Sequence, residues 1–222
     1  MKELARWNSE WALYLVADEI HFRKGLIEDS IVRAIQGGIQ VLQLREKHCS
    51  DQEFIELARR VLRAVRPYQI PIIINDRIEV ALATGAHGVH LGQKDALPSQ
   101  ARETLGANAL IGWSVESEDH ALRANSMDVD YLGISSVFAT QTKPDLRRIW
   151  GLEGVKRLRE ISSLPLIGIG GIHEDNLVSV IQSGADGVAL ISDFRSSEDW
   201  KNKAERLRQR ILNARMEIDH EH

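Results

Sequence analysis

Eight short apolar segments alternate with eight segments of helical character along this chain, and this alternation constrains the fold more than any other feature. The expected strands are rich in Ile, Val and Leu and span 11–17, 39–44, 71–74, 88–91, 110–113, 130–134, 166–169 and 187–191. The expected helices, most of which stop at a glycine, span 26–36, 50–67, 78–84, 98–105, 118–125, 152–161, 176–183 and 197 to about 214. Strands and helices that alternate in this way indicate a parallel sheet covered on both faces.

Eight such units in about 200 residues predict an α/β fold, a single (β/α)₈ TIM barrel. The rival is an open doubly wound sheet, but the first strand–helix turn carries no G-x-G-x-x-G sequence. We expect one domain over residues 1–222, with the barrel from about 11 to 214 and a disordered tail over 215–222. Leu4, Trp7 and Trp11 lie at helical spacing and predict an extra N-terminal helix.

Composition limits the partners of this protein. The 222 residues are 43% apolar and 27% charged, with a net charge of −4, which argues against a nucleic-acid binder that relies on phosphate attraction. No uncharged run approaches membrane-spanning length, and the N-terminal residues lack the apolar core of a signal peptide. The lone Cys49 excludes an internal disulfide. We expect a cytoplasmic protein with small-molecule partners and no nucleic-acid or membrane partner; the sequence leaves a homo-oligomer open.

Polar residues gather where the expected strands end. In a closed parallel barrel all these ends meet at one mouth, where active sites are built. The residues placed there are Gln43, Arg45, Glu46, Lys47, Asn75, Asp76, Gln93, Asp95, Ser114, Thr140, Thr142, Lys143 and Ser192. Asp76 and Asp95 suit a Mg²⁺ ion held by one or two carboxylates and ligand phosphates. Each residue alone also fits a solvated loop or a helix cap, but their convergence favours a site.

A phosphate subsite is expected beside the last two strands. Two adjacent glycines, the second of them Gly171, follow the seventh strand, and Ile191 and Ser192 end the eighth. Barrels commonly bind a phosphate at this position through backbone N–H groups. The histidines show neither a Ser–His–Asp arrangement nor the spacing of a zinc cluster, and His90 is expected to point into the barrel or a neighbouring interface.

Several motifs also resemble a known family. They are Gln-Leu-Arg-Glu-Lys at 43–47, Ile-Asn-Asp-Arg at 74–77, His-Leu-Gly-Gln-x-Asp at 90–95 and Phe-x-Thr-x-Thr-Lys at 138–143, together with 14–18 and 168–172. In order and spacing, from about 13 to 192, the chain resembles thiamine phosphate synthase. The resemblance implies an enzyme that joins a hydroxymethylpyrimidine diphosphate to a hydroxyethylthiazole phosphate. The products would be thiamine phosphate and pyrophosphate.

The resemblance also implies roles for individual residues. The pyrimidine diphosphate would be bound by Gln43, Leu44, Arg45, Glu46, Lys47, Asn75 and Ser114. The thiazole phosphate would be bound by Thr140, Gln141, Thr142, Gly171, Ile191 and Ser192. Arg45, Ser114 and Lys143 would be catalytic, with Lys143 at the leaving pyrophosphate, and Asp76 and Asp95 would hold Mg²⁺. The pyrimidine would leave as a carbocation that the thiazole nitrogen captures, under a loop over 135–149 that excludes water.

The chain departs from the family at two places. Ser135 and Ser136 stand where Gly-Pro is usual, and Glu19 stands where a basic residue is common. Neither change removes an expected phosphate contact or metal ligand. The alternatives are a thiazole tautomerase, a non-catalytic binder of thiazole phosphate and a purely structural barrel. The tautomerase does not need a diphosphate-binding metal, and Asp76, Asp95 and Lys143 together therefore favour the synthase over it.

Overall fold

The computed structural model describes residues 7–18, 21, 27–140, 148–195 and 197–220. Its parallel strands form one closed barrel in which each strand pairs with the next and the last pairs with the first. The strands are β1 (Leu13–Asp18), β2 (Val41–Arg45), β3 (Ile72–Asn75), β4 (Gly88–Leu91), β5 (Leu110–Val115), β6 (Tyr131–Ser135), β7 (Leu166–Ile169) and β8 (Gly187–Leu190). The predicted α/β TIM barrel is therefore confirmed.

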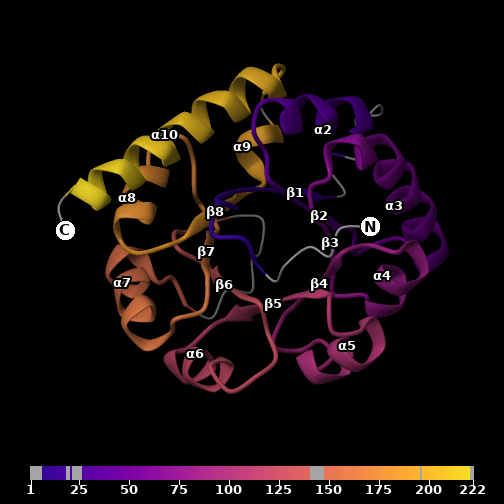
Figure 1. Cartoon of the computed structure of the whole chain (residues 1–222), viewed down its shortest axis with the longest axis horizontal. Coiled ribbons are helices and arrows are strands. Elements are labelled where there is room, and N and C mark those ends of the chain that lie inside the picture. Colours follow the sequence, from indigo (N-terminus) through magenta and orange to yellow (C-terminus); the bar gives the residue numbers. More distant parts are fainter. Residues whose placement is uncertain (1–6, 19–20, 22–26, 141–147, 196, 221–222) are drawn as a thin grey trace.

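The helices surround the barrel (Figure 1). They are α2 (Ile27–Gln36), α3 (Asp51–Val65), the 3₁₀ helix η1 (Arg66–Tyr68), α4 (Ile78–Thr84), α5 (Pro98–Leu105), α6 (Glu118–Ala124), α7 (Gly151–Ile161), α8 (Leu177–Gln182), α9 (Ser192–Arg195) and α10 (Trp200–His220). The helix α3 begins with the expected capping box, in which Ser50 and Glu53 satisfy each other's backbone N–H groups. The sequence did not predict α9, a four-residue helix that follows β8 directly.

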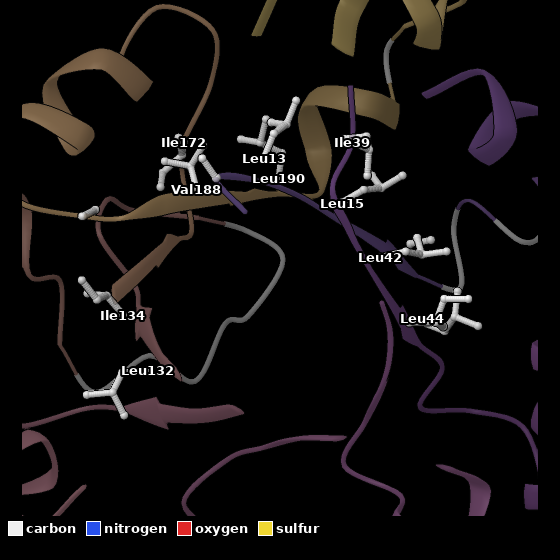
Figure 2. Packing of buried hydrophobic residues seen from close by; sticks show 14 of the residues in the cluster. Leu13, Leu15, Ile39, Leu42, Leu44, Leu132, Ile134, Ile172, Val188 and Leu190 are labelled. Atoms are coloured by element: carbon white, nitrogen blue, oxygen red, sulfur yellow. The ribbon is translucent and has the colours of Figure 1, made fainter. Parts of the chain in front are cut away.

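The alternation of side chains along each strand divides the core into two clusters. Inside the barrel lie Tyr14, Val16, Val41, Ile73, Leu110, Tyr131, Ile167 and Ala189. The other face of the strands packs against the helices, and Figure 2 shows Leu13, Leu15, Leu42 and Leu44 in this outer cluster. The inner residues near the carboxyl ends of the strands are thereby left to form the floor of a cavity.

The N-terminal segment differs from the expectation where the structure describes it. The predicted helix falls partly on residues 1–6, which lie outside the described residues, and residues 7–12 form turns and irregular chain rather than helix. Trp7 instead packs against the inner cluster, with its ring centroid 4.6 Å from that of Tyr131. Trp7 and Trp11, whose spacing predicted one face of a helix, therefore pack over the starts of β1 and β6 instead.

The predicted disordered tail is wrong as far as His220, because α10 continues to that residue. Its inner side is apolar: Leu207, Ile211 and Ala214 are buried, and Ile218 continues the four-residue spacing against the core. The helix packs on α2 and α8, so it spans the junction between the first and last units of the barrel (Figure 1). Within the described part of the chain, no helix combines the length and apolarity that a membrane span requires.

Candidate active site

A cavity opens at the carboxyl ends of the strands, where the sequence placed the site. Eleven of the candidate residues line it: Gln43, Arg45, Lys47, Asn75, Asp76, Asp95, Ser114, Thr140, Gly171, Ile191 and Ser192. They come from the ends of β2, β3 and β5, from the loops that follow β2, β3, β4, β6 and β7, and from the β8–α9 junction. Residues far apart in the chain therefore meet because the parallel strands all end at the same mouth.

Asp76 and Asp95 form an acidic pair on one side of the cavity. Burial, and then the hydrogen-bonded carboxylate of Asp76, raise the pKa of Asp95, while the backbone N–H of Gly92 donates to its Oδ2 at 2.6 Å. Lys47 Nζ lies 3.4 Å from Asp76 Oδ2. Two adjacent carboxylates disfavour each other's charged form, and a divalent cation relieves that repulsion.

The chemistry of these donors fits Mg²⁺. Magnesium is usually held by one or two carboxylates and completes its shell with water and ligand phosphates. Among the described residues, no group of three or more His, Cys, Asp or Glu side chains is placed to hold a metal. A protein-only cage is therefore absent from this part of the chain, and the Asp76–Asp95 pair suits an ion that arrives with a phosphorylated ligand.

The cationic side of the cavity comes from β2 and its loop. Gln43 and Arg45 face the cavity, whereas Leu44, between them, is fully buried in the outer cluster (Figure 2). Glu46 also lies outside the cavity lining, and its carboxylate accepts a hydrogen bond from the backbone of His48 at 2.8 Å. Alternation along β2 turns the Leu44 side chain away from the cavity, and Glu46 follows the strand outside the cavity lining. The expected substrate contacts of these two residues stay predictions.

The floor of the cavity is a chain of polar side chains that the sequence did not reveal. The amide nitrogen of Gln43 donates to the Tyr14 hydroxyl at 2.9 Å, and the Tyr14 and Tyr131 hydroxyls lie 2.9 Å apart. His90 continues the chain, with Nδ1 3.0 Å from the Tyr131 hydroxyl and Nε2 2.9 Å from Ser114 Oγ. Burial raises the pKa of both phenols. His90 does point into the barrel, as expected.

Small residues shape the opposite wall, beside β7. Gly170 and Gly171 have φ values of +93° and +63°, which favour glycine. A Cβ on Gly170 would overlap Ser136 Oγ, and a Cβ on Gly171 would lie 2.5 Å from the carbonyl oxygen of Ala139. This wall therefore has its present shape only with glycine at both positions. Three candidates for the neighbouring loop, Gln141, Thr142 and Lys143, lie outside the described residues.

The short helix α9, which carries Ser192, is tied to the first strand. Arg195, at its end, pairs with the carboxylate of Asp18 at the end of β1. Asp18 is completely buried, and its Oδ1 also lies within hydrogen-bond distance of His21 Nδ1, at 2.8 Å. The position of Ser192 at the cavity thus depends on an ion pair that closes the junction between β8 and β1.

Comparison with known proteins assigns the chain to a family. The model of the family described as thiamine monophosphate synthase matches residues 13–194, which include every strand of the barrel. The chain belongs to the thiamine monophosphate synthase family. The match covers the acidic pair, the cationic loop and the Ser192 corner, so the family assignment and the cavity concern the same residues.

Individual members of the family are similar over nearly their whole length. The chain is 45% identical to a thiamine-phosphate synthase of Albidiferax ferrireducens over 199 residues, covering 90% of this chain and 91% of that protein. It is 41% identical to a thiamine-phosphate synthase of Vibrio campbellii, covering 89% of this chain and 96% of the other. The solved structure of a thiamine phosphate pyrophosphorylase from Pyrococcus furiosus superposes with a TM-score of 0.83 at 34% identity, covering 93% of this chain and 98% of that one.

Proposed function

We propose that this chain is a thiamine-phosphate synthase. It joins a hydroxymethylpyrimidine diphosphate to a hydroxyethylthiazole phosphate and releases pyrophosphate. The observation that carries the proposal is one cavity in which a carboxylate pair, Asp76 and Asp95, lies beside cationic side chains. That combination suits a diphosphate and its magnesium ion, and membership of the family supplies the reaction.

The side chains around the acidic pair would hold the diphosphate. Arg45 and Lys47 line the cavity and offer positive charge to its oxygens, and Asn75 offers an amide. Mg²⁺ held by Asp76 and Asp95 would supply Lewis-acid neutralisation of the charge that develops on the leaving group. Lys143 is proposed to act on the same leaving group. Preorganised positive charge of this kind lowers the barrier to breaking the carbon–oxygen bond.

The remaining candidates would hold the second substrate. We assign its phosphate to Thr140, Gln141, Thr142, Gly171, Ile191 and Ser192. Apolar side chains, among them Val16, Ile167 and Ile169, line the same cavity. An apolar enclosure keeps water from a carbocation until the thiazole nitrogen attacks it. A dissociative substitution of this type needs no protein nucleophile.

The test is the release of pyrophosphate from the two substrates and Mg²⁺, with each of the three omitted in turn. The proposal expects release only with all three present, together with formation of thiamine phosphate. Asp76→Ala is expected to lower kcat at least about a hundredfold, since one charge-neutralising group typically contributes a few kcal/mol to the transition state. Asp119→Ala, in an exposed pair with Arg123, is the matched control and should keep full activity.

Binding of the thiazole phosphate without release of pyrophosphate would refute the proposal. It would indicate the thiazole tautomerase or the non-catalytic binder instead. Unchanged kcat in Asp76→Ala would refute the assignment of the acidic pair.

A further inference from the structure

The hydrogen-bond chain on the cavity floor has a direction that follows from its first member. The Gln43 amide nitrogen can only donate, so the Tyr14 oxygen accepts from it. Tyr14 and Tyr131 are both almost completely buried, and a buried hydroxyl that donates to nothing is costly. Tyr14 therefore donates to Tyr131, the other hydrogen-bond partner of its hydroxyl among the described residues.

The same reasoning carries the direction onward to Ser114. Because the Tyr131 oxygen accepts from Tyr14, its own hydrogen goes to His90 Nδ1. A histidine that accepts at Nδ1 carries its proton on Nε2, and Nε2 then donates to Ser114 Oγ. Ser114 lines the cavity, and its hydroxyl hydrogen is left to be donated to a ligand.

The barrel is shaped to accommodate this chain. A Cβ on Gly112 of β5 would lie 2.4 Å from both His90 Nδ1 and the Tyr131 oxygen. A Cβ on Gly133 of β6 would lie 2.9 Å from His90 Cε1. Two interior positions thus lack side chains where the imidazole and the phenol meet, which keeps His90 within reach of both partners.

We propose that Tyr131 and His90 are positioning residues that hold the Ser114 hydroxyl as a hydrogen-bond donor toward the pyrimidine substrate. This inference rests on the proposed function. Ser114 then selects a hydrogen-bond acceptor on the pyrimidine side of the reaction. The opposite direction would make His90 Nε2 a base for Ser114, which is the arrangement of an activated serine nucleophile. The direction of the hydrogen bonds excludes that role, because His90 Nε2 already carries a proton.

The direction can be tested without turnover. Nitrogen-15 NMR of histidine-labelled protein, with the His90 signal identified by its absence in His90→Gln, distinguishes a protonated Nε2 from a protonated Nδ1. We expect the proton on Nε2 in the wild type and loss of this preference in Tyr131→Phe. A proton on Nδ1 or on both nitrogens of the wild type would overturn the inference, as would an unchanged preference in Tyr131→Phe.

Kinetics test the positioning. In Tyr131→Phe we expect KM for the pyrimidine diphosphate to rise about tenfold, because Ser114 is no longer held in one orientation. KM for the thiazole phosphate should stay unchanged. Tyr68→Phe, which loses a hydroxyl bonded to Gln36 on the surface, is the matched control and should change neither value. Equal rises in both KM values in Tyr131→Phe would indicate general disruption and overturn the positioning role.

The two tests separate this inference from the proposed function. A wild-type enzyme that releases no pyrophosphate refutes the synthase. The histidine signal then still decides the direction of the chain.

Discussion

Gly112→Ala is the substitution that most directly challenges the packing of the cavity floor. Gly112 lies in β5, and its φ is not in the left-handed region, so its backbone does not itself require glycine. In open space the change would stabilise the strand by about 0.5–1 kcal/mol, because alanine loses less conformational freedom on folding. The side chains around Gly112 make the change destabilising instead. The new Cβ would lie 2.4 Å from His90 Nδ1 and the Tyr131 oxygen.

The size of the effect follows from two costs. Forcing a methyl group into a filled interior costs about 1–3 kcal/mol. Separating His90 from Tyr131 leaves a buried donor and acceptor poorly satisfied, which costs about 1–3 kcal/mol more. After the gain in strand propensity, we expect a net loss of about 3 kcal/mol in the free energy of unfolding. With a urea slope near the upper end of the usual range, about 3 kcal/mol per molar, the midpoint falls by about 1 M.

Equilibrium unfolding in urea, followed by tryptophan fluorescence, measures this loss. Gly85→Ala is the control, because Gly85 has φ +66° and no atom lies within 4 Å of the added Cβ. Only the left-handed backbone conformation should then lower the free energy of unfolding, by about 1 kcal/mol. The two variants therefore separate a steric cause from a backbone cause. A Gly112→Ala protein as stable as the wild type, or more stable, would refute the packing argument.

Two further predictions concern the charged groups of the site. Asp95→Asn should raise the Mg²⁺ concentration needed for half-maximal activity about tenfold or more, because the ion loses one of two carboxylates; an unaltered Mg²⁺ titration would contradict its role as a ligand. Arg195→Met should lower the free energy of unfolding by about 2 kcal/mol, less than for a fully buried pair because Arg195 is partly exposed. Burial opposes ionisation of Asp18, but hydrogen bonds from His21 and Arg195 outweigh it and lower its pKa. The stabilisation is therefore present above the unfolded pKa of about 3.9 and lost as pH falls through the lower folded value, so acid should narrow the difference between wild type and variant. Denaturation at neutral and acid pH checks this, with Arg60→Met in an exposed pair as a control that should change little; a gap that widens in acid would count against the reasoning.

The sequence predicted the strand boundaries well where a glycine or proline adjoins the apolar run. The segments Gly88–Leu91 and Leu166–Ile169 begin and end as expected, because glycine or proline adjoins each apolar run. It failed where tertiary contacts decide. The charged residues of α10 resemble a solvated tail, but the helix continues through residues 215–220. Ile218 packs against the core there, and Glu217 accepts a hydrogen bond from Gln182 of α8.

The site was predictable from charge and poorly predictable from apolar or aromatic residues. Charged side chains at strand ends have few structural reasons to be there, so the sequence placed Asp76 and Asp95 at the mouth, where both line the cavity. Their role as metal ligands stays a prediction. Leu44 was included with its motif although the alternation along β2 turns it outward. Tyr14 and Tyr131 look like ordinary core residues in sequence. Only the closed barrel shows that their hydroxyls meet 2.9 Å apart beneath the cavity.

The pairing of β8 with β1 has a consequence for synthesis on the ribosome. The strand β1 (Leu13–Asp18) pairs with β2 along one edge and with β8 (Gly187–Leu190) along the other. The second edge gains its partner only after most of the polypeptide has been made. At a translation rate of roughly 5–20 residues per second, that edge waits on the order of ten seconds or longer. Arg215 of α10 then bonds the carbonyl oxygens of Ser9 and Asp186, on the two sides of the junction. The nascent chain therefore carries an exposed strand edge, open to chaperones and to aggregation, until β8 emerges.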